Sequence, residues 1–451
     1  MSSKNEVFGY LPDERPPIIE LFFFALQQIV VMFPATVLVA LITGFHVSTT
    51  IFASGLATLG FILVTGRKIP LYYGSSFSYI AAIASIMSAE AFAGLSLDEK
   101  ISIAQFGIIM SGFVSIVAGL IIQRSGKETI DKVLPATVTG SIAIIIGLSL
   151  AANAMTNAAS IPAGVAEIQI ALAGSMAWLV AIITLLSTIM YSVYLKGKLS
   201  QLPILFGLFT GYLAAAVIGF ATGIPFITFN TIQSAGILSI PIFTFPTPSL
   251  AAVIAIMPIA IATIPESTAH VYQLDIYVND LARRKGVKKK YDIESKLGLN
   301  LIGDGIGDII SGFIGGPAGT NYGENISAMA ISKNFSIYVL MLAAVFTMVI
   351  SCFTPLINVI YSIPKSVIGG LSIYLFGVIA AQGITIMMDR KVDMFSSKNL
   401  AVIAVILIVG LGGSFGFEGG MIPMFGTQLP AIATAAIVGI LLNLMLSFEN
   451  K

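Results

Sequence analysis

The sequence predicts an all-α integral membrane protein whose fourteen transmembrane segments form two inverted repeats of seven. Three observations support this: an apolar composition, basic residues gathered on one side of the predicted membrane, and a glycine-containing motif that occurs twice. Of the 451 residues, 57% are hydrophobic and 10% are charged, whereas soluble domains carry about 25% charged residues. The chain therefore has too few polar residues to cover a soluble surface.

Apolar segments between polar breaks define the predicted spans. Several, such as 172–195, reach the ~20 residues that a helix needs to cross a bilayer. The fourteen segments are 17–44, 48–66, 70–88, 103–122, 134–153, 172–195, 200–221, 249–275, 297–315, 320–332, 335–361, 364–387, 398–415 and 427–447. An even number of spans places both termini on one side.

The basic residues indicate which side that is. Of the 23 Lys and Arg residues, only Lys100 and Lys365 fall on the side opposite the termini, so the positive-inside rule places both termini in the cytoplasm. The run RRKGVKKK, residues 283–290, is interpreted as a topology determinant, with contact to anionic lipid secondary. The first apolar segment has no cleavage site after it and is expected to remain as a helix of the cell membrane.

One short motif occurs in both halves. YGSSFSYIAAI at 73–83 in the third segment is similar to YGENISAMAI at 322–331 in the tenth, and each follows an upstream proline, Pro70 or Pro317. An offset of seven spans reverses the membrane orientation, as in an inverted repeat. Because non-helical backbone at membrane depth must be buried or line a cavity, short extended segments in spans three and ten predict a binding site near the midplane.

Each extended segment is expected to lead into a half-helix. Residues 319–323 would be extended and Glu324 would begin one half-helix, whose free N–H groups and positive dipole end face the site. Ser75 and Ser76 would open the other. These backbone donors suit a ligand with carbonyl oxygens, and Ser76 is a predicted substrate-binding residue.

Ionisable side chains within spans are candidates for function, since an ionised carboxylate in hydrocarbon costs at least ~2.5 kcal/mol. Glu266 and His270 share a helix face at i and i+4, as a proton-exchanging pair or as a structural contact between helices. Asp304 either supports the site, including proton coupling, or forms structural hydrogen bonds, and Asp308 is interpreted as structural. Glu324 faces the predicted site.

Other polar and aromatic residues have narrower interpretations. Phe77 is expected to stack on a ligand, and Gln27 and Gln28 are expected to form helix–helix hydrogen bonds. A single cysteine, Cys352, and two histidines give no metal-ligand cluster, so no metal or other cofactor is expected.

Several stretches resemble the nucleobase-ascorbate transporter family, also called nucleobase-cation symporter-2, and most closely its bacterial uracil permeases. They are ERPPIIELFFFALQQIVVMFPATVLV at 14–39, KIPLYYGSSFSYI at 68–80, the Glu266 and His270 pair, and YGENISAMAISK at 322–333. The resemblance implies a core domain from spans one to four and eight to eleven, a gate domain from the others, and a possible homodimer.

The implied organisation divides the chain into five parts. A cytoplasmic tail covers 1–16, the core domain covers 17–133 and 249–361, and the gate domain covers 134–248 and 362–451.

The resemblance also implies roles at the site. Glu266 and Glu324 would accept hydrogen bonds from ring N–H groups, and backbone amides at Phe77 and at Gly323 or Glu324 would donate to ring carbonyls. His270 would assist recognition or proton coupling, and Phe77 would pack against the ring. Glu324 stands where purine carriers have Gln. Three residues depart from the family pattern, namely Gln28, Ser327 and Ser332.

The expected function is secondary active import of a nucleobase, most directly uracil, by proton symport with alternating access. A xanthine or urate symporter of the same family is the alternative, and an anion carrier of the same fold is less favoured because two carboxylates lie at the site. Sodium coupling remains open, since carboxylates serve both ions. No enzyme motif and no nucleic-acid partner are indicated.

Overall fold

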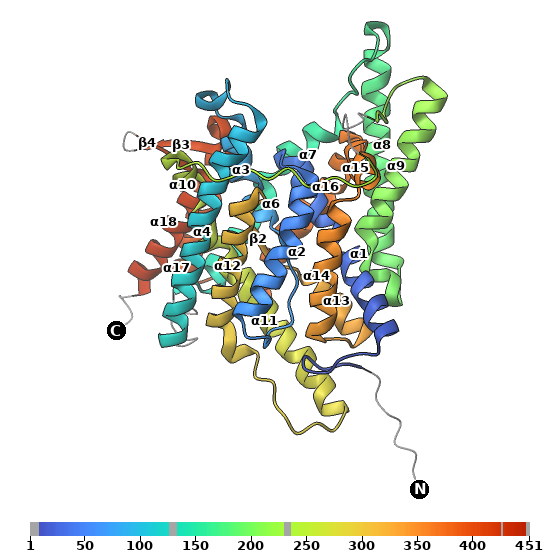
Figure 1. The fold of residues 1–451 in the computed structure, drawn as a ribbon. Helices are drawn as coiled ribbons and strands as arrows, with labels where there is room; N and C mark the ends of the chain where they lie inside the picture. Colours follow the sequence, from blue (N-terminus) through green and yellow to red (C-terminus); the bar gives the residue numbers. More distant parts are fainter. Residues whose placement is uncertain (1–8, 126–132, 230–235, 425–426, 448–451) are drawn as a thin grey trace.

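The computed structural model describes residues 9–125, 133–229, 236–424 and 427–447 as a bundle of helices (Figure 1). Within these residues, ten helices are long and apolar enough to cross a membrane, and three shorter apolar helices accompany them. Each of the fourteen predicted segments contains at least one helix. The all-helical membrane architecture is therefore confirmed, whereas the span count stays a prediction.

The first half of the chain contains eight described helices and one strand. They are α1 (Ile18–Thr43), α2 (Val47–Val64), β1 (Tyr73–Ser75), α3 (Ile80–Ser88), α4 (Leu97–Ser125), α6 (Ala136–Ser149), α7 (Ala151–Ala158), α8 (Ile170–Tyr194) and α9 (Pro203–Thr222). Short 3-10 turns join them: η1 (Phe77–Tyr79), η2 (Glu90–Phe92), η3 (Glu167–Gln169) and η4 (Gly197–Gln201).

The second half adds nine described helices, the strand β2 and a hairpin of β3 and β4. They are α10 (Leu250–Ile256), α11 (Ile259–Arg284), α12 (Leu297–Ile314), β2 (Gly319–Asn321), α13 (Gly323–Ser332), α14 (Ile337–Ser351), α15 (Thr354–Tyr361), α16 (Lys365–Asp389), α17 (Ser397–Gly416), β3 (Met421–Met424), β4 (Thr427–Pro430) and α18 (Ala431–Ser447). Two 3-10 turns lie between them, η5 (Glu294–Lys296) and η6 (Glu418–Gly420).

Three predicted spans are each divided into two helices. The division between α10 and α11 falls at Pro258, which has no N–H to donate to the helix. Between α14 and α15 it falls just before Pro355, which occupies the first turn of α15. The third division, at Leu150 between α6 and α7, has no such residue.

The two predicted extended segments meet at the centre of the bundle. β1 and β2 pair antiparallel, with Tyr73 opposite Asn321, Gly74 opposite Thr320 and Ser75 opposite Gly319. A Cβ on Gly74 would lie 2.4 Å from the Tyr322 ring, and a Cβ on Gly319 would lie 2.4 Å from the Gly74 carbonyl oxygen. Glycine is therefore required on both strands. The structure confirms the extended segments.

The half-helices begin slightly away from the predicted residues. Ser75 belongs to β1, and Ser76 alone caps η1, its side chain accepting a hydrogen bond from the Ser78 amide at 3.3 Å. α13 begins at Gly323, with Glu324 in its first turn. Ser75 was therefore wrongly placed at a helix start.

Small residues let long helices approach closely. α4 packs against α12, α2 against α14 and α6 against α16. On the α4–α12 pair, a Cβ on Gly112 would lie 2.5 Å from the Gly305 carbonyl oxygen, and one on Gly298 would lie 2.6 Å from that of Gly119. Backbone-to-backbone contact of this kind is a common means of packing helices in membranes.

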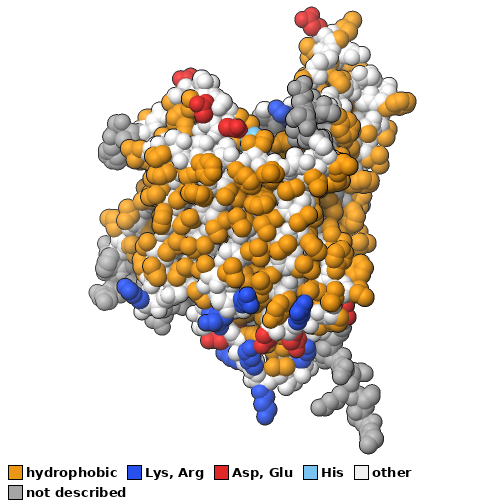
Figure 2. Space-filling view, in the orientation of Figure 1, with side chains coloured by type: hydrophobic (Ala, Val, Ile, Leu, Met, Phe, Trp, Pro, Cys, Tyr) orange, Lys and Arg blue, Asp and Glu red, His pale blue; other side chains and the backbone are white. Residues whose placement is uncertain are grey.

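The two ends of the bundle differ in charge. Figure 2 shows a broad hydrophobic belt with Lys and Arg gathered below it and mainly Asp and Glu above it. We call the end that carries Arg67, Lys68 and residues 283–290 the basic end. The end that carries Asp98 and Glu99 is called the acidic end.

Residues 9–17, the N-terminal arm, lie on the basic end. The Tyr10 amide donates to the Lys333 carbonyl at 2.8 Å, and the Phe335 amide donates to the Tyr10 carbonyl at 2.8 Å. Burial and the neighbouring Glu20 carboxylate, which accepts the Tyr10 hydroxyl, raise the pKa of Tyr10 to about 12. The arm is thus joined to the turn between α13 and α14.

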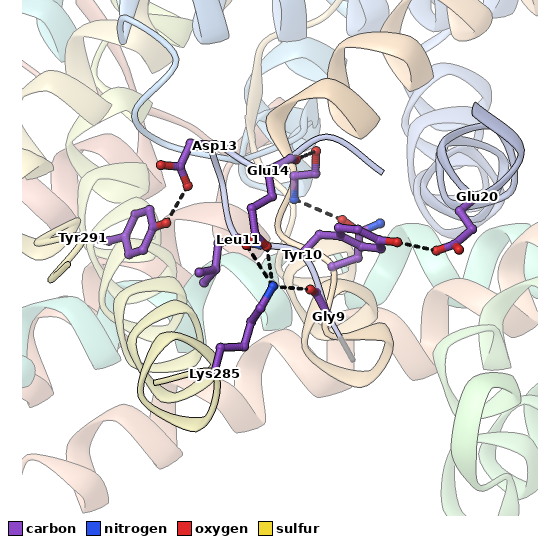
Figure 3. A network of polar contacts seen from close by, with 10 residues as sticks. Gly9, Tyr10, Leu11, Asp13, Glu14, Glu20, Lys285 and Tyr291 are labelled. Atoms are coloured by element: carbon purple, nitrogen blue, oxygen red, sulfur yellow. Dashed lines mark hydrogen bonds and ion pairs between the residues drawn. The ribbon is translucent and has the colours of Figure 1, made fainter. Parts of the chain in front are cut away.

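Charged side chains hold the same arm to the end of α11 (Figure 3). The Lys285 ammonium donates to Glu14 at 2.6 Å, and Lys289 and Tyr291 donate to Asp13 at 2.6 and 2.5 Å. Partial burial works to raise the pKa of Asp13, but the hydrogen bonds from Lys289 and Tyr291 outweigh it and leave that pKa below its usual value. The arm therefore links α11 to the α13–α14 turn.

Candidate functional site

A cavity of about 600 Å³ lies beside the paired strands β1 and β2, which we call the strand crossing. One side, the crossing wall, comes from β1, η1, α11, β2 and α13: Ser75, Phe77, Ser78, Ala262, Pro265, Glu266, Ala269, His270, Gln273, Thr320, Asn321, Tyr322, Gly323, Glu324 and Ser327. The other side, the opposite wall, comes from α6, α9 and α16: Thr139, Ala143, Ile146, Pro203, Ile204, Tyr374, Leu375, Val378, Ile379, Gln382, Thr385 and Ile386.

The structure brings most predicted site residues together. Five of the six predicted substrate-binding residues line this cavity: Phe77, Glu266, His270, Gly323 and Glu324. Ser76 does not, because its hydroxyl caps η1 and its amide donates to the Ala318 carbonyl at 3.0 Å. Its neighbours Ser75 and Ser78 line the cavity in its place.

His270 is held against the beginning of α13. A Cβ on Gly323 would lie 2.8 Å from His270 Nε2, so only glycine leaves room for the imidazole. Glu324, the next residue of α13, therefore faces the cavity beside His270. Glu266, one turn before His270 on α11, lines the same cavity. Two carboxyl groups and an imidazole thus share one wall with the N-terminus of a helix.

Several buried polar atoms of this wall have no hydrogen-bond partner among the described residues. They are His270 Nδ1, Thr320 Oγ1 and Asn321 Oδ1. Since buried polar atoms in folded proteins are nearly always hydrogen-bonded, a polar molecule bound in the cavity could complete their hydrogen bonding. The wall is therefore chemically suited to a ligand that both donates and accepts.

A layer of polar side chains lies directly behind the crossing wall. The Asp304 carboxylate accepts hydrogen bonds from Ser267 Oγ at 2.6 Å, Asn321 Nδ2 at 2.8 Å and Asn300 Nδ2 at 3.1 Å. Asp304 is buried and is not among the residues that line the cavity. Asp304 contacts Asn321 of the wall and Ser267, which follows Glu266. These contacts position the site. A role of Asp304 in proton coupling stays a prediction.

Asp308 holds the strands themselves. Its carboxylate accepts hydrogen bonds from the Tyr73 hydroxyl and from the Gly319 amide, the latter at 2.8 Å. One carboxylate thus joins α12 to both β1 and β2. These contacts agree with the structural interpretation of Asp308.

The three departures from the family pattern have different surroundings. Gln28 accepts a hydrogen bond from Asn325 Nδ2 through its side chain at 2.8 Å, which confirms a helix–helix contact. Ser327 lines the cavity. Ser332 donates to the Ala328 carbonyl within its own helix at 2.8 Å, so only Ser327 is placed to meet a ligand.

Sequence reasoning missed the opposite wall. Its polar members include Thr139, Tyr374 and Gln382. Gln382, a polar side chain well inside a predicted span, is the clearest sequence signal of this wall. Among the described residues, no group of three His, Cys, Asp or Glu side chains could hold a metal ion.

The cavity is adjoined by a second one on the side of the basic end. This second cavity, about 520 Å³, shares Thr139, Pro265, Ala269 and Ile386 with the first. Its other lining residues include charged groups at the end of α16 and the start of α17, namely Asp389, Arg390, Lys391, Asp393 and Lys398. The first cavity is thus bordered by a charged vestibule.

Apolar side chains fill the space toward the acidic end. Phe77 packs edge-to-face on Phe376 of α16, with ring centroids 6.4 Å apart. Leu38, Ile80 and Leu150 belong to the same buried cluster. The cavity is therefore closed by packed side chains on this side.

Solved transporters share the fold. The murine Solute Carrier 26 family member A9 anion transporter, in an inward-facing state, matches with a TM-score of 0.64 and 12% identity over 97% of this chain and 69% of that one. The transmembrane domain of a cyanobacterium bicarbonate transporter, BicA, matches with a TM-score of 0.58 and 14% identity over 96% and 99%.

Sequence relatives are closer. The uracil permease of Bacillus caldolyticus is 34% identical over 440 residues, 96% of this chain and 93% of the relative. The uracil permease of Escherichia coli (strain K12) is 33% identical over 433 residues, 96% and 92% of the two chains. A family model, Xan_ur_permease, described as "Permease family", matches residues 19–419. The chain belongs to this permease family and is a membrane transporter.

Proposed function

We propose that the protein imports uracil, or a close analogue, across the cell membrane by proton symport. The observation that carries the proposal is the joint position of Glu266 and Glu324 on one cavity wall, at the N-terminus of α13. The names of the sequence relatives, which are uracil permeases, support the same substrate.

The chemistry of the crossing wall suits the edge of a uracil ring, on which C=O and N–H groups alternate. Carboxylates accept hydrogen bonds from ring N–H groups, and free backbone amides at the start of α13 and near Phe77 donate to ring carbonyls. Phe77 lines the cavity and supplies an aromatic surface for the ring. Ionised acceptors make such hydrogen bonds roughly twice as strong as neutral ones.

The proposed proton pathway uses Glu266 and His270, with Asp304 behind them. Ser267 connects Asp304 to the segment that carries Glu266 through its 2.6 Å hydrogen bond. Uptake should then increase as external pH falls and should not depend on sodium. Sodium-dependent uptake without pH dependence would assign the coupling ion to Na+ instead.

The fourteen-span inverted repeat is proposed on the basis of helix pairing. Under a shift of seven spans, the α4–α12 contact corresponds to the α2–α14 contact, and α8–α9 corresponds to α17–α18, all of which are extensive in the structure. The α6–α16 contact corresponds to itself, because α6 lies in span five and α16 in span twelve, and the shift of seven exchanges these two spans.

This pairing supports a core domain of 17–133 and 249–361 and a gate domain of 134–248 and 362–451. The crossing wall would then belong to the core and the opposite wall to the gate. Alternating access would move the one against the other.

The basic end is proposed to face the cytoplasm, together with both termini. The positive-inside rule supports this orientation. The charged vestibule would then be the cytoplasmic exit, and the Phe77–Phe376 packing would close the external side. A homodimer is proposed as the assembled form, which chemical cross-linking in native membranes would test.

Uptake of radiolabelled uracil by a permease-deficient strain tests the substrate. We expect saturable uptake that unlabelled uracil competes away and that Glu324→Gln abolishes. Competition by xanthine or urate in place of uracil would favour a purine carrier. Absence of uptake by a protein that reaches the membrane in normal amount would refute the substrate assignment.

The fold also matches anion transporters, so an anion carrier is the second candidate. Two carboxyl groups beside the N-terminus of α13 would repel an anion that this helix end would otherwise attract. Bicarbonate or sulfate uptake by the same cells, in place of uracil uptake, would favour this candidate.

A further inference from the structure

Residues 236–249, GILSIPIFTFPTPS, form an extended segment at the acidic end, which we call the strap (Figure 1). The strap contains no helix and leads into α10. We propose that it is a lipid-contacting surface, lying at the boundary between headgroups and acyl chains, that completes the apolar belt where the helix beneath it is too short to do so.

One end of the strap is fixed to the junction between α14 and α15. The Ser239 amide donates to the Cys352 carbonyl at 2.9 Å, and the Thr354 amide donates to the Ile237 carbonyl at 3.1 Å. These two antiparallel bonds satisfy backbone groups on both partners. The strap therefore covers the end of α14.

Further along, side chains of the bundle hold the strap by its carbonyl groups. Thr49 Oγ1 of α2 donates to the Ile242 carbonyl at 2.5 Å. Gln105 of α4 donates to the Thr244 carbonyl at 2.8 Å and to the Gly312 carbonyl at 2.7 Å, and it accepts the Thr244 hydroxyl at 2.7 Å. Gln105 is fully buried, and its amide nitrogen donates to one carbonyl of the strap and to one carbonyl near the end of α12.

Backbone groups that face water need no protein partner, whereas those at membrane depth or buried in protein do. The strap also has fewer donors than an ordinary loop, since Pro241, Pro246 and Pro248 have no N–H. Both features reduce the number of backbone groups that lipid would leave unsatisfied.

The depth of the strap agrees with this environment. Gln105 lies eight residues inside α4, which begins at Leu97, and this corresponds to ~12 Å along the helix. The acidic residues Asp98 and Glu99 lie at that helix start. The strap therefore lies below the charged tip of the acidic end, near the upper edge of the hydrophobic belt seen in Figure 2.

Four apolar side chains of the strap are largely exposed. Ile237, Leu238, Ile240 and Phe245 are between 65% and 80% exposed. A row of such residues in water would be unfavourable by ~25 cal/mol for each Å² of apolar surface. Contact with lipid removes this unfavourable term.

The length of α14 explains why an apolar cover is required. α14 has 15 residues, which span ~22 Å at 1.5 Å per residue, whereas the hydrocarbon core is ~30 Å thick. The strap lies across the end of α14, at the break before α15, and adds apolar side chains there.

Collision accessibility of spin labels tests the proposal. Labels are attached to Ile240→Cys and Phe245→Cys in a Cys352→Ser background, and the proteins are reconstituted in phosphatidylcholine vesicles. Val217→Cys of α9, which is 60% exposed, is the lipid control, and Glu167→Cys at the acidic end is the water control. Binding of uracil by each labelled protein shows that it is folded without bearing on the location of the strap.

At positions 240 and 245 we expect oxygen to collide several-fold more often than a water-soluble nickel chelate, as at position 217. A nickel preference like that at position 167 would place the strap in water and overturn the proposal. Low access to both reagents would mean that protein covers the strap, as in a subunit contact, and would overturn it as well. If position 245 does not tolerate the label, Ile237→Cys gives the same comparison.

Discussion

The two walls of the cavity are built differently. The crossing wall has two carboxyl groups, an imidazole, an asparagine and the open end of α13. Behind it, Asp304 accepts a hydrogen bond from Asn321 and Asp308 accepts one from the Gly319 amide. The opposite wall is mostly aliphatic, with residues such as Ile146, Leu375 and Val378. Most groups that can hydrogen-bond a ligand therefore lie on the crossing wall. The opposite wall offers mainly aliphatic surface, which suits the proposed movement of the gate domain against the core domain.

Glycine packing does not distinguish the two sides. Cβ atoms at Gly74, Gly319 and Gly323 would each lie within 2.8 Å of another atom, and on α16 a Cβ on Gly370 or Gly383 would lie 2.4 Å from a backbone carbonyl oxygen. Both sides are therefore closely packed, and the walls differ in the side chains that face the cavity.

Among the variants that compare the two walls, the largest effect is expected from Glu266→Gln. A neutral amide keeps the shape but removes a charged acceptor, and hydrogen bonds to charged groups contribute ~1.5–3 kcal/mol. We expect uracil binding to weaken ~100-fold, measured by isothermal titration on purified protein. Binding within threefold of the unchanged protein would mean that the crossing wall is not the recognition surface.

Gly323→Ala tests the close approach of His270 to α13. The new methyl group would lie 2.8 Å from His270 Nε2, so the imidazole or the helix start must shift, and misplacement by ~1 Å can reduce activity ~100-fold. We expect uptake to fall at least tenfold. Gly377→Ala of α16, where a Cβ would meet nothing within 4 Å, is the matched control and should transport normally; equal losses in both variants would mean that the loss does not come from the contact with His270.

Gly305→Ala tests the rigidity of the support behind the crossing wall. Its methyl group would lie 2.3 Å from the Gly112 carbonyl oxygen, and overpacking of this kind costs ~1–3 kcal/mol. We expect a lower Tm in detergent than for Gly412→Ala of α17, where a Cβ meets nothing within 4 Å. An unchanged Tm would show that α4 and α12 can separate without loss.

Gln382→Leu tests whether the opposite wall contributes at all. A neutral hydrogen bond is worth ~0.5–1.5 kcal/mol, so we expect KM for uracil to rise ~2–10-fold with kcat retained. An effect as large as that of Glu266→Gln would assign recognition to both walls and contradict the comparison.

The smallest effect concerns the N-terminal arm, outside both walls. The folded pKa of Asp13 is lowered, so its contribution to stability is present above its unfolded pKa and is lost as pH falls through the lower folded value. The Asp13 and Lys289 side chains are more than half exposed, so Asp13→Asn should cost under ~1 kcal/mol at pH 7. In thermal unfolding we expect the difference between the two proteins to be smaller at pH 3 than at pH 7.

The crossing wall could be predicted from sequence because its residues are rare in their context. Two Tyr-Gly pairs are followed by polar residues within apolar segments. Glu266 and Glu324 are likewise acidic residues within apolar segments, where such residues are rare. The role of Asp304 could not be resolved in this way, because its partners Ser267 and Asn321 come from other elements.

The opposite wall could not be predicted, because a cavity-facing aliphatic residue is indistinguishable from a lipid-facing one in sequence. Val378 lines the cavity, whereas Ile384 of the same helix is half-exposed on the outside. Helix breaks were only partly visible: Pro258 marks one, but nothing at Leu150 marks another. The type and approximate position of each segment could therefore be predicted from the sequence, whereas the breaks inside segments could be predicted only in part.

The N-terminal arm also has a consequence for how the protein is made. Its contacts join Gly9 to Lys285 and Glu14 to Ser336, pairs separated by 276 and 322 positions. During synthesis the arm therefore stays undocked until the ribosome has produced the turn after α13. Docking of the arm would mark the moment when the helices around the strand crossing are complete, so a protease that cleaves only the undocked arm would report on unfinished chains.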